Sequence, residues 1–402
     1  MNKTARLLVV WLTVFIDLLG FSIIIPILPD LAVSMGEPLT RILPVENLDT
    51  DKVALAVAAL YPLMNFLFAP FWGSLSDRLG RRPVILFSIG VTAVSQFWFA
   101  FVTAFWMLAL QRCLAGIGSA NISAANAYIA DISTKETRAK NMGLIGAAFG
   151  MGFIVGPVIG GFLYESYGLF GVGMASGGLS LINLIFGYFY LNESLQEKNT
   201  ETKGSMNPIK PLLKAMNHRA VRGIFLLNLL FIAAFSLMQV TAAILWEEHF
   251  LLSKKEIGLV FSFIGFSSAL VQFTLVGVLN KWLGEKRLLF IGLILLAVSL
   301  AAMPMVSNIY WELVPLAGIA LANGCINPSL LSLLSGQVGP KEQGNILGLN
   351  QSIGSLGRVV GPVIGGLLYA YNFHAPYWGG ALILLLALLF TFDIYRKKII
   401  RE

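Results

Sequence analysis

One acidic residue, Asp17, lies in the middle of the first apolar segment of the chain, WLTVFIDLLGFSIIIPILPD. A charged side chain in the centre of a bilayer costs about 3 kcal/mol or more, so we expect Asp17 to face the interior of a helix bundle. A carboxyl group that is neutral in one state and charged in another can exchange a proton for a substrate cation. The alternative is a structural role, in which Asp17 pairs with a buried arginine.

Two arginines also lie inside apolar segments. Arg112, in LQRCLAGIGSANISAANAYIAD, starts a run of small residues and is near enough to a segment end for partial solvation to be expected. Arg358 lies within GRVVGPVIGG. An arginine stays charged in hydrocarbon and needs a carboxylate, carbonyl groups, water or an anionic ligand. Two partners remain open for Arg358, namely Asp17 and an acidic group on a substrate.

The stretch GSLSDRLGRR, residues 73–82, concentrates charge in a short turn. It combines one acid, three arginines and two glycines: Asp77, Arg78, Arg81, Arg82, Gly73 and Gly80. We interpret it as an ionic latch that holds helix ends together and breaks when the protein changes state. The alternative is a basic loop that only sets topology. In a second copy, residues 277–287, Lys281 replaces Asp77 and Glu285 replaces Arg81, so any latch should be asymmetric.

A glycine-proline pattern, GxxxGPxxGG, occurs twice, at 152–161 and 357–366. Its fixed positions are Gly152, Gly156, Pro157, Gly160, Gly161, Gly357, Gly361, Pro362, Gly365 and Gly366. Glycines four apart lie on one helix face and allow a neighbouring backbone to approach closely. Proline removes a backbone hydrogen bond and bends a helix. The repetition predicts two similar halves, each with one bent, closely packed helix.

Composition identifies a polytopic membrane protein. The 402 residues are 57% hydrophobic and 12% charged, with a mean hydropathy of +0.78. Twelve apolar segments are long enough to cross about 30 Å of hydrocarbon: 7–31, 53–75, 83–103, 105–129, 141–164, 169–191, 221–246, 256–280, 288–306, 310–335, 344–369 and 375–395. A polar linker, 192–220, separates two parallel six-helix bundles, 1–191 and 221–402.

The net charge of +7 is interpreted as a topology signal and not as a nucleic-acid patch. Most Lys and Arg residues lie at the N-terminus, in alternate loops, in the linker and in the C-terminal RKKIIRE. The positive-inside rule therefore predicts that both termini and the linker are cytoplasmic. The short loops are typical of a bacterial protein, which predicts the bacterial cytoplasmic membrane.

The sequence offers little for cofactor or enzyme chemistry. Cys113 and Cys325 lie in apolar segments without metal-ligand spacing, and the three histidines form no acid–base pair with a midplane residue. No phosphate-binding loop that would indicate ATP as the energy source is present. We therefore expect no cofactor, no metal site and no enzyme. Gln239, Asn323 and Asn327 are the polar groups of the second half expected to contact a substrate.

The ordered motifs GSLSDRLGRRP, LQRCLAGIGSA and GFIVGPVIGG, after a first segment with an aspartate, resemble the major facilitator superfamily, in particular its twelve-span drug/proton antiporters such as the tetracycline exporters. The resemblance implies two six-helix bundles, a central cavity and alternating access. It implies a latch of Asp77 with Arg78 and Arg82, and proton coupling through Arg112 and Asp17. The chain departs from the tetracycline exporters in two respects. Those exporters carry a further acidic residue in the membrane region of the second half, where we place none, and the second glycine-proline pattern here contains Arg358.

The function predicted from these features is a secondary active transporter that exports an amphipathic organic compound in exchange for protons. Its partners would be the small-molecule substrate, protons and the lipid bilayer, with no nucleic acid. The resemblance implies a monomer. The alternative is an importer or facilitator of the same fold for an acidic metabolite, with Arg358 as the anion anchor.

Overall fold

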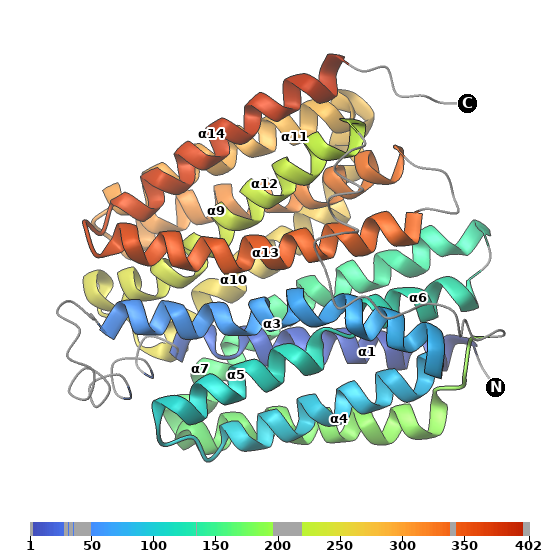
Figure 1. The fold of residues 1–402 in the computed structure, drawn as a ribbon. Helices are drawn as coiled ribbons and strands as arrows, with labels where there is room; N and C mark the ends of the chain where they lie inside the picture. The colour runs from blue at the N-terminus through green and yellow to red at the C-terminus, as the bar shows by residue number, and fades with distance from the viewer. Residues whose placement is uncertain are drawn as a thin grey trace. The chain divides into compact units, whose positions relative to one another are not determined.

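The computed structural model describes residues 3–27, 31, 35, 50–133, 135–195, 219–337 and 343–396, and every regular element in these ranges is a helix (Figure 1). In chain order the elements are α1 (Lys3–Ser22), the 3-10 turn η1 (Ile25–Ile27), α3 (Thr50–Leu79), α4 (Arg81–Phe99), α5 (Phe105–Ser119), α6 (Ile122–Ile132), α7 (Lys135–Tyr190), α9 (Arg219–Phe250), α10 (Lys254–Thr274), α11 (Val276–Ala302), η2 (Met303–Met305), α12 (Ile309–Ser335), α13 (Gln343–Tyr369) and α14 (Ala375–Arg396).

These helices account for all twelve predicted segments. The α7 helix covers the fifth and sixth, with Gly168 at φ 61° between them, and α11 changes direction at Gly284, φ 74°, between the eighth and ninth. Glycine adopts this left-handed conformation without the steric cost that other residues meet. The fourth segment, expected to be continuous, is divided into α5 and α6. The predicted all-α fold of twelve membrane spans is thus confirmed.

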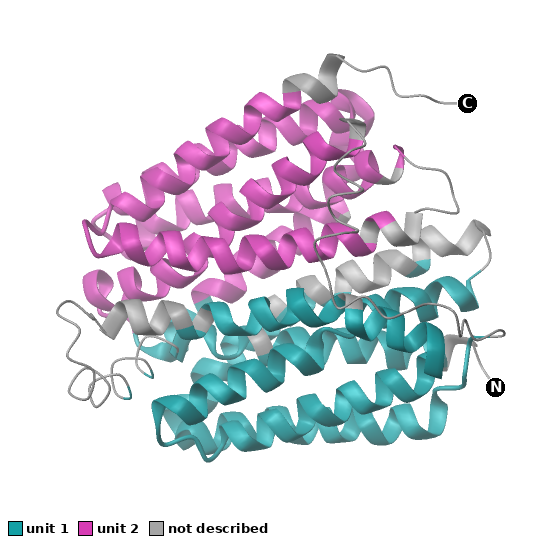
Figure 2. Cartoon of the chain, in the orientation of Figure 1, with its two compact units in different colours: residues 1–208, 253–259 teal, residues 209–252, 260–402 magenta. Residues whose placement is uncertain are grey.

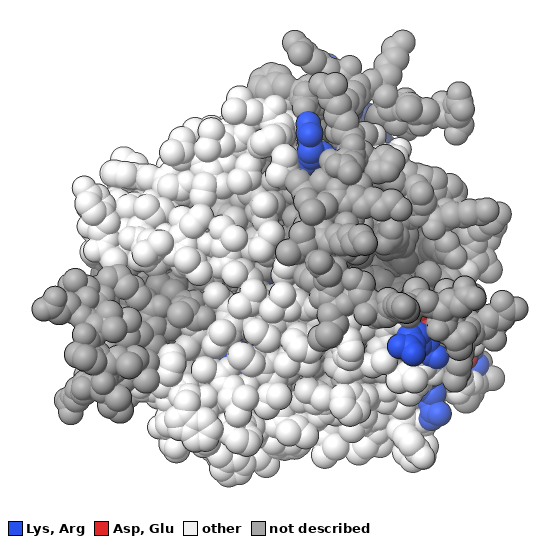
Figure 3. Space-filling view, in the orientation of Figure 1, with Lys and Arg blue, Asp and Glu red and all other residues white. Residues whose placement is uncertain are grey.

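Seven stretches of described helix are long and apolar enough to cross a bilayer by length and composition alone. Two shorter apolar helices, Ala59–Ala69 and Ala375–Thr391, fall within further predicted segments. On the face drawn in Figure 3, the described side chains over the middle of the helices are uncharged. Such a surface is expected where helices border lipid tails.

The chain forms two compact units, coloured separately in Figure 2: residues 1–208 with 253–259, and residues 209–252 with 260–402. We call them the N-terminal unit and the C-terminal unit. Most of the predicted linker, residues 196–218, lies outside the described residues, as does the end of the C-terminal basic tail.

Equivalent helices pack together in the two units. In the N-terminal unit α1 and α4 pack on α7, and α4 packs on α5. In the C-terminal unit the corresponding pairs are α9 with α13, α11 with α14, and α11 with α12. The two units therefore repeat one arrangement of six spans, as the duplicated glycine-proline pattern predicts.

Candidate functional site

Asp17 is buried on α1, with 3% of its surface exposed. Thr92 of α4 donates a hydrogen bond from its hydroxyl to Oδ1 of Asp17, at 3.2 Å. Asn121, in the break between α5 and α6, also interacts with the carboxylate. The second oxygen, Oδ2, is buried and has no hydrogen-bond partner among the described residues. Asp17 thus lies inside the N-terminal unit, held by neutral polar groups on one side.

The small residues of the fourth segment create the space for this arrangement. A Cβ atom added at Gly116 would collide with the backbone carbonyl of Tyr61, and one added at Gly118 would lie 2.6 Å from the hydroxyl of Thr92. The backbone of α5 can therefore approach α3 and α4 closely. Tyr61 in turn donates a hydrogen bond to the backbone carbonyl of Asp17, at 3.4 Å. The run of small residues that begins after Arg112 thus packs three helices around the acid.

Arg112 is almost completely buried, with 1% of its surface exposed, so the expectation of partial solvation is wrong. Its Nε donates to Oε1 of Gln111 at 2.6 Å, and its guanidinium lies 5.4 Å from the centre of the Phe99 ring. Nη2 has no hydrogen-bond partner among the described residues. Tyr61 interacts electrostatically with Arg112 and bonds to the backbone of Asp17. No ion pair between Asp17 and Arg112 is present in the described part of the chain.

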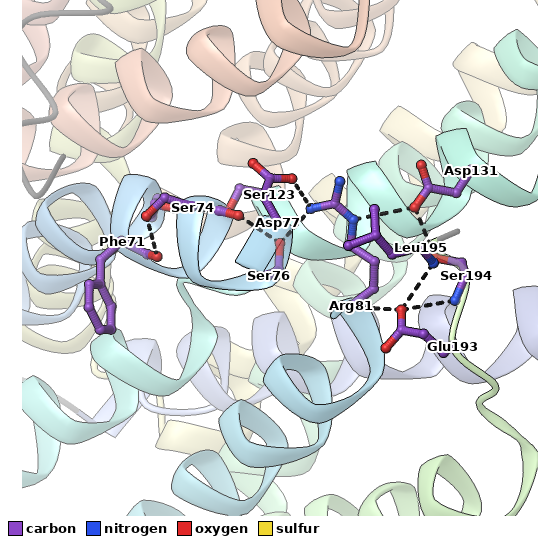
Figure 4. A network of polar contacts seen from close by, with 12 residues as sticks. Phe71, Ser74, Ser76, Asp77, Arg81, Ser123, Asp131, Glu193, Ser194 and Leu195 are labelled. Atoms are coloured by element: carbon purple, nitrogen blue, oxygen red, sulfur yellow. Dashed lines mark hydrogen bonds and ion pairs between the residues drawn. The ribbon is translucent and has the colours of Figure 1, made fainter. Parts of the chain in front are cut away.

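Arg81, the first residue of α4, is the centre of the loop network in Figure 4. Its guanidinium pairs with Asp77 at 2.6 Å and with Asp131 at the end of α6 at 3.3 Å, and it donates to the hydroxyl of Ser76 at 2.6 Å. Arg81 is buried, whereas Arg78 is exposed. The acid of the motif therefore pairs with Arg81, and not with Arg78 or Arg82 as the resemblance implies.

Glu193, just beyond α7, binds the start of α4. Its carboxylate accepts hydrogen bonds from the backbone N–H groups of Arg81, at 2.9 Å, and Arg82, at 3.3 Å. Gly80 has φ 113°, and a Cβ atom there would collide with the Glu193 carboxylate. Gly73, the other glycine of the motif, faces the side chain of Ser123 on α6.

Sequence reasoning missed Asp131 and Glu193, although both follow apolar segments as isolated acids. Both residues lie at the ends of even-numbered segments, the fourth and the sixth, which the predicted topology places on the same side of the membrane as the motif. This shared side could have predicted that they lie near the arginines of the motif. The network as a whole connects α3, α4, α6 and the residues after α7 within the N-terminal unit.

The second copy of the motif keeps the geometry with altered charges. Gly284 adopts a left-handed conformation as Gly80 does, and the next residue, Glu285, accepts a hydrogen bond from Ser332 of α12. A carboxylate bonded to a hydroxyl thus stands where the N-terminal unit has an arginine paired with acids. The latch-like charge network is asymmetric between the units, as the sequence predicts.

The first glycine-proline helix packs directly on the half of α1 that follows Asp17. Cβ atoms added at Gly152, Gly156 or Gly160 would meet the side chains or backbone of Leu18, Ser22 and Ile23 at sub-van der Waals distances. Ser22 donates a hydrogen bond to the carbonyl of Gly152, at 2.8 Å. The glycine face is therefore a close α1–α7 contact.

The second glycine-proline helix makes the equivalent contact in the C-terminal unit. A Cβ atom added at Gly361 would collide with the carbonyl of Ala233 on α9, and Gly357 and Gly365 also face α9. Both prolines, Pro157 and Pro362, lie within helices that continue past them.

The polar candidates of the C-terminal unit lie on three helices. Asn327 and Asn323, one turn apart on α12 and half-buried, are joined by a hydrogen bond of 2.7 Å. Gln239 is buried on α9. Arg358, on α13, is half-buried, with its guanidinium against Gly354. A pairing of Arg358 with Asp17 stays a prediction, because the two residues belong to different units.

The expectation that the second half carries no acid in its membrane region is wrong. Glu312, in the first turn of α12, is completely buried. Trp246 of α9 donates its indole N–H to Oε1 of Glu312 at 3.2 Å, and Oε2 has no hydrogen-bond partner among the described residues. The residue lies within a helix stretch, Ile309–Leu334, that is apolar enough to cross a bilayer. Glu312 lies at the start of the predicted segment 310–335, where the sequence alone does not indicate whether an acid faces water or the interior.

The chain is similar along most of its length to known membrane transport and resistance proteins. The family model described as "Major Facilitator Superfamily" matches residues 10–246 and 224–399. The tetracycline resistance protein, class C, of Escherichia coli is 32% identical over 94% of this chain and 93% of its own length. Multidrug resistance protein 2 of Bacillus subtilis (strain 168) is 28% identical over 99% of this chain and 97% of its own length. The solved structure of the human organic anion transporter MFSD10 (TETRAN) aligns with a TM-score of 0.77 at 24% identity, over 97% of this chain and all of that one.

Proposed function

The chain belongs to the major facilitator superfamily of multi-pass membrane transporters, and from that premise we propose that it exports an amphipathic organic compound in exchange for protons by alternating access. The observation that carries the proposal is the environment of Asp17, a buried carboxylate with one unpartnered oxygen and no cation paired with it among the described residues. The relatives named for tetracycline and multidrug resistance support export of a drug-like compound.

Asp17 is the proposed proton-binding group of the N-terminal unit. A buried charge without a counter-ion is costly, so the site favours either a bound proton or a bound cation. Thr92 can donate to the ionised form, which keeps that form accessible. Proton and cationic substrate would then compete for one carboxylate, and this competition couples their movements.

Arg112 is the proposed modulator of this step. It lies close to Tyr61, which bonds to the backbone of Asp17, and carries a buried N–H group without a partner among the described residues. A small change in the distance between the Arg112 guanidinium and Asp17 would change the positive potential at the acid. The resemblance to drug/proton antiporters gives the arginine at this position the same role.

The Arg81 network is the proposed latch of one transport state. It holds the ends of three helices through a buried arginine and two carboxylates. The two glycine-proline helices, packed on α1 and α9, are the proposed sites of re-packing between states. Both termini and the linker are proposed to be cytoplasmic, in a bacterial inner membrane, and the protein to be monomeric.

The test is proton movement in proteoliposomes with an internal pH dye and an imposed pH gradient. Cationic, zwitterionic and acidic amphiphiles are added in turn, and wild type is compared with Asp17→Asn. Substrate-triggered proton movement that is lost in the variant supports antiport. Thr92→Val is the matched control, since it keeps the carboxyl group and should alter the pH dependence without abolishing coupling. Uptake without proton movement, unchanged in Asp17→Asn, contradicts the proposal.

A second candidate function is uptake or facilitated movement of an acidic metabolite, with Arg358 as the anion anchor. The observation that favours it is an arginine on the closely packed helix α13, at a place where the first copy of the motif has Phe153. Arg358→Ala should abolish binding of an acidic substrate and spare a cationic one. Loss of acidic-substrate transport in this variant, with no proton movement in wild type, would favour the second candidate.

A further inference from the structure

The C-terminal unit contains a buried cluster of one acid, one tryptophan and one tyrosine that the proposed function does not use. Glu312 of α12 has none of its surface exposed, and neither has Trp246 of α9 nor Tyr377 of α14. The three residues come from the last turn or two of α9 and from the first turn of α12 and of α14. All three therefore lie at the same end of the unit.

The two oxygens of Glu312 have different surroundings. Oε1 accepts the indole N–H of Trp246 at 3.2 Å, while the buried Oε2 has no hydrogen-bond partner among the described residues. No described lysine or arginine forms an ion pair with Glu312. An ionised carboxylate buried in this way costs several kcal/mol, whereas a neutral carboxyl group is compatible with burial. Oε2 of Glu312 can therefore bind one proton.

Among the described residues, a phenol and a second acid interact with this cluster or its neighbours. Tyr377 interacts electrostatically with both Glu312 and Glu248, and its hydroxyl lies near Thr241. Glu248, two residues after Trp246 on α9, is exposed and accepts a hydrogen bond from Tyr369 of α13 at 2.7 Å. From α10, the neighbour of the cluster is the ring of Phe261, which packs edge-on against Trp246. Tyr377 therefore interacts with both the buried acid and a solvent-exposed one at this end of the unit.

We infer that Glu312 is a second proton-binding carboxyl, located in the C-terminal unit and reached from the side of Glu248 and Tyr377. The inference rests on the proposed proton antiport, and the predicted topology places this end of the unit on the external side. In the step, hydronium in the external water transfers a proton to Oε2 of Glu312 and leaves water, and the carboxylate becomes a neutral carboxylic acid. When the site opens to water again, the proton returns to solvent and the carboxylate is restored.

The site would complement Asp17 by its location. Asp17 lies in the middle of the first span of one unit, whereas Glu312 lies in the first turn of the fourth span of the other. Two acids in different units can be exposed to water in different states of an alternating-access cycle. A protein with both acids has two sites at which a proton can bind during the cycle.

The test is a pH-difference infrared spectrum of the protein in liposomes, without substrate. Wild type should show a carboxyl C=O band that appears as the pH falls, and Glu312→Gln should lose the part due to Glu312. Glutamine keeps the size of the side chain and can still accept the bond from Trp246, so the fold should persist; an unchanged melting temperature checks this. Trp246→Phe should shift the pH midpoint of the same band, because the carboxylate loses its donor.

Matched controls identify the band. Glu285→Gln changes an acid of the same unit that is bonded to Ser332 and should leave the Glu312 band in place. Asp17→Asn should remove a different part of the spectrum. A Glu312→Gln spectrum identical to wild type, with an unchanged pH dependence of transport, would overturn the inference even if Asp17→Asn abolishes coupling. A band that titrates and is lost in Glu312→Gln supports the proton site even where substrate transport shows no proton movement.

Discussion

The contact between α1 and α7 predicts that Gly156→Ala destabilises the protein, although alanine is the better helix former. A Cβ atom at Gly156 would collide with the hydroxyl oxygen of Ser22 and lie 3.0 Å from its Cβ and 3.1 Å from the backbone nitrogen of Ile23. Unstrained contacts between such atoms are about 3.5–4.0 Å. The two helices must separate by about 0.5–1 Å, and Ser22 must also rotate and give up its bond to Gly152.

The magnitude follows from three opposing terms. Overpacking a closely packed contact costs about 1–3 kcal/mol, and loss of the Ser22 hydrogen bond costs about 1 kcal/mol. Replacing glycine by alanine inside a helix returns about 1 kcal/mol. We expect the free energy of unfolding of Gly156→Ala to fall by about 1–3 kcal/mol, the sum of these ranges.

The assay is thermal unfolding of the purified protein in detergent, followed by tryptophan fluorescence, with Gly178→Ala as the control. Gly178 lies in the second of the two spans that α7 covers, beyond Gly168, and a Cβ atom added there has nothing within 4 Å. The control should therefore melt at or above the wild-type temperature, because only the helix-propensity term remains. If Gly156→Ala melts at the same temperature as Gly178→Ala, the α1–α7 contact is not close packed and the role assigned to the glycine face is refuted.

Two further predictions concern the loop network and its second copy. Arg81→Ala should lower the free energy of unfolding by about 1–3 kcal/mol. This is less than the cost of breaking a fully buried ion pair, because both aspartate partners of Arg81 are partly exposed. The control, Arg78→Ala at an exposed position, should change the free energy of unfolding by less than about 0.5 kcal/mol. Equal effects in chemical unfolding would contradict the assignment of Arg81 as the centre. Gly80→Ala should be more destabilising than Gly284→Ala, because both positions have positive φ but only Gly80 also faces a carboxylate, that of Glu193. A difference in melting temperature of the opposite sign would contradict it.

The sequence predicted the fold because membrane proteins must satisfy backbone hydrogen bonds within each span. Length and hydropathy of each segment therefore identify helices with little help from tertiary contacts. The duplicated glycine pattern predicted two similar units, and the structure shows its physical basis in the equivalent contacts of α7 with α1 and of α13 with α9. The burial of Asp17 followed from the cost of exposing a carboxylate to lipid.

What the sequence left open depended on partners far away along the chain. Asp77 has three arginines nearby in sequence, and only the tertiary structure selects Arg81, because that side chain is turned toward Asp131, 50 residues later. The helix break at Asn121 and the burial of Arg112 likewise depend on how α3, α4 and α5 meet at their small residues.

Glu312 shows most directly how what the sequence determines differs from what only the tertiary structure determines. Hydropathy determined that α12 spans the membrane, since that property belongs to each segment by itself. At the edge of a segment, however, an acid is equally compatible with water and with burial. Only the packing of α9 against it, with the indole of Trp246 bonded to its carboxylate, decided that Glu312 is an interior residue.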